Sequence, residues 1–218
     1  MQANKKDTKE IVIIALKLLV ICAIVAALVA SVNLITKDKI ALNQKIKTAE
    51  ALTRICEADG LVFSVDENGS YVVSDKDGNA AGSCDTADAE LKDDIDAVYI
   101  IKDTAGNVLS YCVEASPMGF KNEVGILVAV NPDRTIKDVQ IISLSDTKGI
   151  GDKVTDSSYL KLFKGRTMGF STNTDALKAN GMIIAGATRT SEPVSKAIDT
   201  AVTQVSEIID GKAGADVE

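Results

Sequence analysis

AGATRTS, at residues 185–191, immediately precedes the most strongly patterned helix that the sequence predicts. Gly186 and Ala187 are small residues, so a ligand can approach the backbone closely at this point. The hydroxyl of Thr188 is expected where free N–H groups and the positive end of the helix dipole favour a phosphate. The stretch therefore predicts a phosphate-binding loop, and an ordinary hydroxyl-capped loop without a ligand is the alternative.

The helix that follows is expected to run from about Ser191 to Ile209. Its apolar residues recur at helical spacing on one face, which predicts packing against a sheet. Thr190 or Ser191 is expected to be the N-cap, because a hydroxyl there accepts a hydrogen bond from the first turn. Pro193 would then lie in that first turn, where its missing N–H costs nothing.

GATRTS, at residues 186–191, resembles the flavinylation motif of the FMN-binding domain family, in which the Thr after Gly-Ala carries FMN through a phosphoester bond. The resemblance implies that Thr188 is the acceptor of covalent FMN. It also implies a cofactor-binding role for the neighbours of Thr188, which are Gly186, Ala187, Thr190 and Ser191.

A second stretch, SDTKGIGDK at residues 145–153, resembles the family's loop against the isoalloxazine ring, with Lys148 in place of the usual Pro. The resemblance implies that Thr147, Lys148, Gly149 and Ile150 contact the flavin. Two glycines permit a close backbone approach here, and the isoleucine supplies an apolar face.

Other parts of the sequence match the family less closely. SPMGF, at residues 116–120, stands where relatives have a Gly-rich turn near the flavin, and a plain hairpin loop is the alternative. Met182 and Ala185 stand where the family usually has Asp and Ser or Thr. A flavin transferase reads this motif, so these two positions bear on how completely the chain is modified.

The order of the two motifs behind one N-terminal membrane span resembles the G subunit of Rnf electron-transport complexes. The resemblance implies a flavoprotein subunit that relays electrons in ferredoxin:NAD oxidoreduction coupled to ion translocation and is not catalytic alone. The implied partners are the other membrane subunits and a flavin transferase. One alternative is a part like the C subunit of the sodium-translocating NADH:quinone reductase. Another is a membrane-anchored binding or adhesion domain without a cofactor.

Composition excludes several functions. The chain has 218 residues, a net charge of -7 and no histidine. The acidic balance argues against a nucleic-acid partner, and the lack of histidine excludes histidine-based acid–base catalysis and histidine-ligated metals or haem. No catalytic residue and no metal site is predicted. The four cysteines have no CxxC spacing, and three of them allow either one disulfide or none: Cys56, Cys84 and Cys112.

The N-terminal part of the sequence predicts one transmembrane helix. Residues 18–36, 19 in all, carry no charge, and at about 1.5 Å per residue they cross a hydrocarbon core of about 30 Å. A cleaved signal peptide is the alternative, although no small-x-small cleavage site follows the apolar stretch. Lysines flank both ends in nearly equal number, so charge does not set the orientation.

These features divide the chain into a cytoplasmic tail at 1–10, a transmembrane helix at 11–36, a helical stalk at 37–58 and an extracytoplasmic FMN-binding domain at 59–218. The family layout alone supplies the orientation. It implies a single-pass protein of the cell inner or plasma membrane.

The domain is expected to have an α+β fold, an antiparallel sheet with packed helices. Runs rich in Val, Ile and Tyr between turn residues predict a hairpin across 61–74 and a meander across 97–144. The Asp-rich stretch 75–96 predicts a solvated loop, and residues 157–164 predict a short helix. The four strands of the meander are expected at 97–102, 108–114, 124–130 and 136–144.

Overall fold

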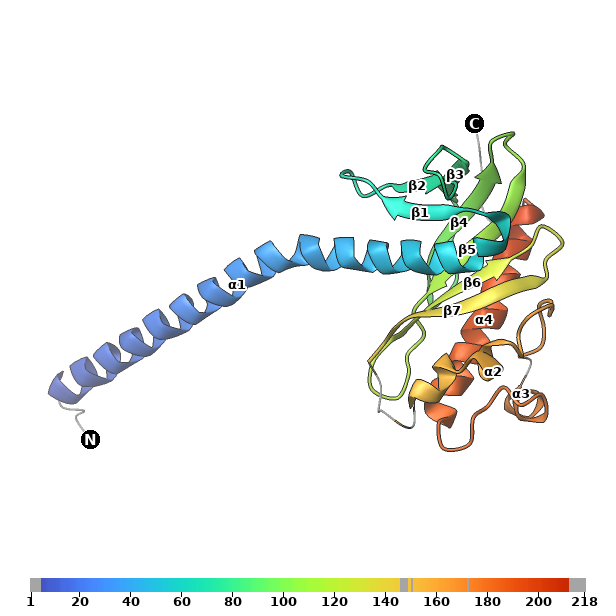
Figure 1. Cartoon of the computed structure of the whole chain (residues 1–218). Coiled ribbons are helices and arrows are strands. Elements are labelled where there is room, and N and C mark those ends of the chain that lie inside the picture. Colours follow the sequence, from blue (N-terminus) through green and yellow to red (C-terminus); the bar gives the residue numbers. More distant parts are fainter. Residues whose placement is uncertain (1–4, 146–148, 150, 172, 212–218) are drawn as a thin grey trace. The chain divides into compact units, whose positions relative to one another are not determined.

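The computed structural model describes residues 5–145, 149, 151–171 and 173–211. The chain divides into two compact units, Met1–Gln44 and Lys45–Glu218. A continuous helix, α1 (Lys5–Ile55), makes up the described part of the first unit, and its residues from Lys45 onward belong to the second (Figure 1). The helix expected for the stalk is therefore present as far as Ile55, and the domain limits at 36 and 58 remain predictions.

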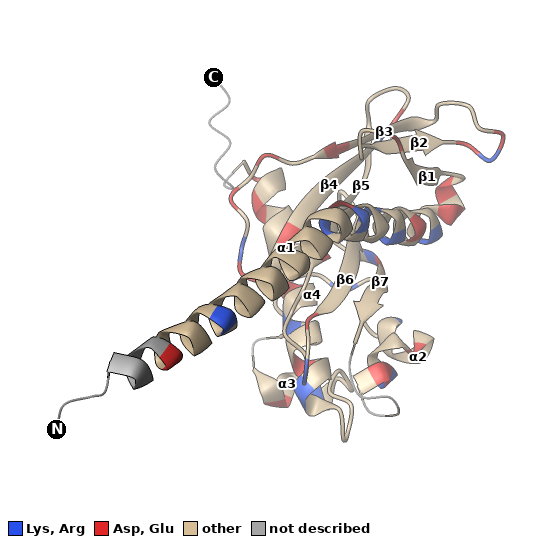
Figure 2. Ribbon diagram, turned by 90° about the vertical axis from the view of Figure 1, so that its left-hand side faces the viewer, with Lys and Arg blue, Asp and Glu red and all other residues tan. Residues whose placement is uncertain are grey.

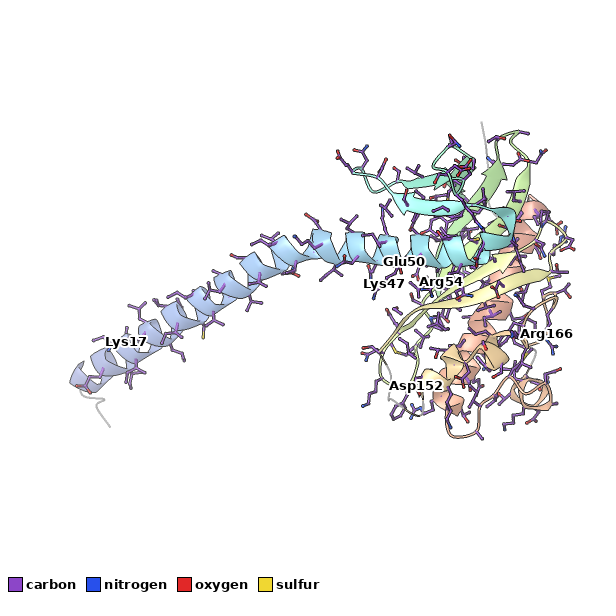
Figure 3. All side chains as sticks on the ribbon, in the orientation of Figure 1. Lys17, Lys47, Glu50, Arg54, Asp152 and Arg166 are labelled. Atoms are coloured by element: carbon purple, nitrogen blue, oxygen red, sulfur yellow. The ribbon has the colours of Figure 1, made fainter. Side chains whose placement is uncertain are left out.

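The first unit contains the apolar part of the helical segment Glu10–Ile55. By its length and composition, this segment could cross a membrane. The middle part of the first unit is free of charged residues in Figure 2, and Lys17 lies near its N-terminal end (Figure 3). The hydroxyls of Ser31 and Thr36 donate to carbonyls four residues earlier, at 2.8 and 2.9 Å. These polar groups are thus satisfied within the helix, as a bilayer requires.

The second unit contains two antiparallel sheets. The first is the predicted hairpin, and the second is a five-stranded meander in the order β3-β4-β5-β6-β7. The four strands expected between 97 and 144 are confirmed with small shifts at their ends. The bounds are β1 (Val62–Val65), β2 (Tyr71–Ser74), β3 (Gly82–Thr86), β4 (Ile95–Asp103), β5 (Val108–Ala115), β6 (Val124–Val130) and β7 (Ile136–Leu144).

The prediction that 75–96 is entirely a loop is wrong, because β3 lies within it. This strand pairs with β4 from Gly82 opposite Asp103 to Thr86 opposite Tyr99. It is an edge strand with partly exposed side chains, so its sequence lacks the apolar alternation that marks a strand. Pairing with a neighbour, rather than local pattern, makes it a strand.

Helices and short 3-10 turns complete the unit. The helix expected at 157–164 is shorter than predicted, and α3 was not predicted. The bounds are η1 (Glu57–Asp59), η2 (Gly151–Thr155), α2 (Ser157–Leu160), α3 (Thr174–Ala179) and α4 (Thr188–Ile209).

Both faces of the five-stranded sheet are covered. Apolar side chains of α4, such as Val194 and Ile198, pack on one face with Phe163 from the segment after α2. Leu52 and Ile55 of α1 pack on the other face together with the β1–β2 hairpin. β6 is buried along its whole length, because both of its faces are covered. Figure 1 shows α4 and the end of α1 on opposite sides of the sheet, and the predicted α+β class is confirmed.

The spacing of the cysteines in the sequence allows either one disulfide or none. In the structure all four cysteines are free thiols. Cys56 and Cys112 are buried in the core between the sheet and α1, and Cys84 lies half-buried beside it. Burial raises the pKa of Cys56 and Cys112, and it raises that of Cys84 to about 12. These thiols are therefore protonated at neutral pH and pack as small apolar groups.

Candidate functional site

The N-terminus of α4 lies three residues earlier than predicted, at Thr188. Ala187 occupies the N-cap position, and its carbonyl accepts the N–H groups of Thr190 and Ser191 at 3.0 and 2.9 Å. Gly186 has a φ of +83°, a backbone conformation that favours glycine and turns the chain into the helix. The prediction of a hydroxyl N-cap at Thr190 or Ser191 is therefore wrong, because both residues lie inside the helix.

Thr190 and Ser191 are buried, with exposed fractions of 1% and 0%. The Oγ of Ser191 accepts the N–H of Ile184 at 3.0 Å and donates to the carbonyl of Ala187 at 3.0 Å. Ser191 therefore holds the loop before α4 against the helix. The cofactor-binding role predicted for both side chains remains a prediction.

Pro193 is the sixth residue of α4 rather than part of its first turn. It has no N–H to donate to the carbonyl of Arg189, four residues earlier. The expectation that Pro193 costs nothing is wrong, because the earlier helix start moves it into the second turn.

Thr188 differs from both hydroxyl residues that follow it. Its side chain is exposed, and within the described part of the chain neither its hydroxyl nor its N–H forms a hydrogen bond with another residue. It stands at the positive end of a 22-residue helix, where a phosphate is favoured. Among the described residues at the start of α4, Thr188 thus has a hydroxyl that a ligand could reach.

A buried tyrosine fixes the loop that leads to Thr188. The hydroxyl of Tyr159 lies 3.2 Å from the carbonyl oxygens of Met182 and Ser191 and 3.0 Å from the Oγ of Ser195. Burial raises the pKa of Tyr159 to about 12, so this group stays protonated. The role of Tyr159 is not evident from the sequence, because nothing in the short helix around it indicates which segments its hydroxyl contacts.

Met182 has a fully buried side chain that belongs to the core between the sheet and α4, whereas Ala185 is exposed. At the position where the family usually has Asp, this chain therefore has a side chain that packs in the core. The carbonyl of Met182 also accepts a hydrogen bond from the Oγ of Ser195 at 2.9 Å.

A surface depression of about 450 Å³ lies beside Thr188. This volume is within the range of small-molecule sites. One wall is the first two turns of α4, and another is the β5–β6 turn that contains Met118 and Gly119. The lining residues are Asp94, Met118, Gly119, Thr188, Arg189, Glu192, Pro193 and Lys196. The structure thus brings the 116–120 turn next to Thr188, whereas the expected proximity of this turn to a flavin remains a prediction.

Only part of the second motif, residues 145–153, lies within the described residues. Gly149 is exposed and has a φ of +82°, while Thr147, Lys148 and Ile150 lie outside the described residues. The motif begins near the β5–β6 turn, because the side-chain amide of Asn122 donates to the carbonyl of Ser145 at 2.8 Å. The flavin contacts predicted for this loop remain predictions.

The site is an exposed threonine hydroxyl beside a ligand-sized depression in an α+β domain, and a helix of membrane-spanning length precedes this domain in the chain. Comparison with known families is more specific. Residues 119–203 match the FMN-binding domain family, and residues 1–55 match the RnfG N-terminal region. The chain therefore carries an FMN-binding domain behind an RnfG-type N-terminal region, and its predicted resemblance to the G subunit of Rnf complexes is confirmed.

Two relatives are similar over almost their full length. The G subunit of the ion-translocating oxidoreductase complex of Methanosarcina acetivorans is 29% identical over 204 residues, which cover 92% of this chain and 97% of the relative. The G subunit of the proton-translocating ferredoxin:NAD(+) oxidoreductase complex of Clostridium ljungdahlii is 26% identical over 216 residues, which cover 96% and 100%. The crystal structure of NqrC from Shewanella oneidensis shares 25% identity, with a TM-score of 0.41 over 53% of this chain and 60% of that chain.

Proposed function

We propose that this chain is a membrane-anchored electron-transfer flavoprotein subunit of an Rnf-type complex and that FMN is attached to Thr188 through a phosphoester. The FMN-binding domain and the two G-subunit relatives support the class of function. The residues around Thr188 fit the cofactor, since a free hydroxyl and an unpaired N–H adjoin a depression of suitable size.

The choice of Thr188 as the attachment site depends on a contrast in exposure between Thr188 and Thr190, which lie in the same helical turn. Thr188 is exposed, whereas Thr190 is only 1% exposed. An ester bond requires an oxygen that another protein, the flavin transferase, can reach. The Oγ of Thr188 forms a bond to the flavin-side phosphorus of a flavin dinucleotide donor, the P–O–P bond of the donor breaks, and the nucleoside monophosphate and the hydroxyl proton leave. The net mass gain of the chain equals one FMN less one water.

Attachment through the phosphate leaves the isoalloxazine ring free to accept and donate electrons, which is the chemistry that FMN supplies. The chain supplies the rigid loop before α4 and apolar surface close to Thr188. Met118 and Phe120 of the β5–β6 turn are 58% and 50% exposed, so their apolar surface is open to a ligand. They offer a surface against which an aromatic ring can rest.

The proposed anchor is the apolar part of α1, with the FMN-binding domain outside the cytoplasm. Electrons would then pass to and from other membrane subunits. The length and composition of α1 support the anchor, and the names of the relatives support a multi-subunit complex.

In-gel fluorescence tests this function. The full chain is produced with and without a flavin transferase, separated on a denaturing gel and viewed under ultraviolet light. We expect a fluorescent band at the mass of the chain only with the transferase. A dark band with active transferase, shown by a second flavinylated protein in the same cells, would contradict the proposal and favour a binding domain without cofactor.

A further inference from the structure

Two cationic side chains line the depression beside Thr188, and they differ in how they are paired. The Nζ of Lys196 lies 2.8 Å from a carboxylate oxygen of Glu192, and that oxygen also accepts the hydroxyl of Thr174 at 2.7 Å. Arg189 forms no ion pair with any described carboxylate. Of the two cations, Arg189 is therefore the one that no described carboxylate neutralises, so its charge is available to an anionic ligand.

Arg189 instead lies over an aromatic ring. Its guanidinium carbon is 5.4 Å from the ring centroid of Phe120, a distance at which a cation is attracted to the ring face. This contact uses no hydrogen bond of the guanidinium group, so its N–H donors are available to a ligand. The contact with Phe120 thus restrains the arginine without using its hydrogen-bond donors.

The turn that carries Phe120 is itself held in place. The N–H of Gly119 donates to the carbonyl of Asn122 at 2.9 Å, and the N–H of Val124 donates to the carbonyl of Pro117 at 2.9 Å. Phe120 is half-exposed at this turn. It therefore forms a fixed platform next to the first turn of α4.

We propose that Arg189 is the phosphate-binding side chain of the Thr188 site and that Phe120 positions it. Arginine presents paired donors that match phosphate oxygens, and Arg189 directly follows the acceptor threonine in the sequence. Asp94 also lines the depression, and its carboxylate would repel an anionic ligand, which Arg189 offsets. The inference rests on the proposed function in that the ligand is FMN.

Titration with FMN and riboflavin tests this proposal, because the two share a ring and differ in the phosphate. The full chain, produced without transferase and kept in detergent, is titrated with each by fluorescence. Arg189→Gln is expected to weaken FMN binding about tenfold or more, since it loses charge-assisted hydrogen bonds, and to leave riboflavin binding unchanged. Phe120→Leu is expected to weaken FMN binding about two- to fivefold more than it weakens riboflavin binding, because only FMN has the phosphate that Arg189 contacts. Arg54→Gln removes the same charge from an exposed position on α1 (Figure 3) and should change neither.

Equal FMN affinity of Arg189→Gln and Arg54→Gln would overturn the proposal. An equal loss of riboflavin affinity would also overturn it, because the arginine would then shape the depression rather than bind phosphate. On the flavinylated chain, the phosphorus NMR resonance of the ester should shift in Arg189→Gln and not in Arg54→Gln, and an unshifted resonance counts against it. FMN on Thr188 with no effect of Arg189 would contradict this inference alone, whereas absence of FMN from Thr188 in the wild type would contradict the proposed function.

Discussion

The hydroxyl of Tyr159 lies 3.0 Å from the Oγ of Ser195, in the interior of the domain. Tyr159 comes from α2 and Ser195 from α4, and both contact the carbonyl of Met182. Three segments that are distant in sequence thus meet at one buried polar cluster. The loop that presents Thr188 is consequently anchored in the core, although Thr188 itself faces solvent.

Removal of this hydroxyl should destabilise the domain. Tyr159→Phe is expected to lower the free energy of unfolding by about 1–3 kcal/mol, because buried polar groups lose a partner. Tyr111→Phe is the control, since Tyr111 is half-buried and its hydroxyl has no hydrogen bond with another described residue. Denaturant titration followed by circular dichroism measures both, and equal midpoints for the two variants would refute the anchoring role.

Glu114 should make stability depend on pH. Its carboxylate accepts the hydroxyl of Tyr99 at 2.8 Å and that of Thr48 at 3.2 Å, and burial raises its pKa. A raised pKa means that the folded state binds the proton more tightly than the unfolded state. The contribution of Glu114 to stability therefore falls as the pH rises from its unfolded pKa of about 4.3 through its folded pKa.

Comparison of Glu114→Gln with the wild type isolates this effect. Hydrogen bonds in turns lower the pKa of Asp75, Asp103 and Asp133. These three carboxyls therefore make the free energy of unfolding rise with pH, but they do so equally in the wild type and the variant. The variant is expected to gain stability relative to the wild type as the pH rises through that window. The free energy of unfolding of both proteins, measured from acid to neutral pH, tests this. If the difference between the two free energies did not change with pH, titration of Glu114 would not contribute to stability.

Gly149 tests the predicted flavin-side loop. Its φ of +82° disfavours other residues, and an added Cβ would meet no atom within 4 Å. Gly149→Val should shift the absorption or midpoint potential of the attached flavin while the ester remains. Gly106→Val is a matched control at a φ of +87° with the same open space, in the β4–β5 turn. The same spectrum and potential in both variants and the wild type would place the loop away from the cofactor.

Thiol labelling tests the proposed orientation. Single cysteines replace Glu10, before the apolar stretch, or Glu67, in the β1–β2 turn, and both positions are exposed. The background lacks Cys22 and Cys84 and keeps the two buried cysteines. An impermeant reagent is expected to label Glu67→Cys in intact cells and Glu10→Cys only after lysis. The opposite pattern would reverse the topology.

Much of the fold follows from local pattern, whereas the site depends on contacts that a single sequence does not display. The apolar face of α4 and the strands of the meander follow from periodicity. The start of α4 was misplaced because the carbonyl of Ala187, rather than a hydroxyl, accepts the first N–H groups. The pairing of Phe120 with Arg189 joins residues that are distant in sequence, and only the packed sheet brings them together.

The central claim is that FMN is esterified to Thr188, and peptide mass mapping tests it most directly. The wild type, Thr188→Val and Thr190→Val are each produced with the flavin transferase, digested and analysed. Thr188→Val should remain folded, because the hydroxyl has no partner among the described residues and its loss costs about 1 kcal/mol at most. We predict a gain of one FMN less one water on the peptide that contains Thr188 in the wild type and in Thr190→Val, and no gain in Thr188→Val. FMN on Thr190, or on no peptide of the wild type despite active transferase, would contradict the account.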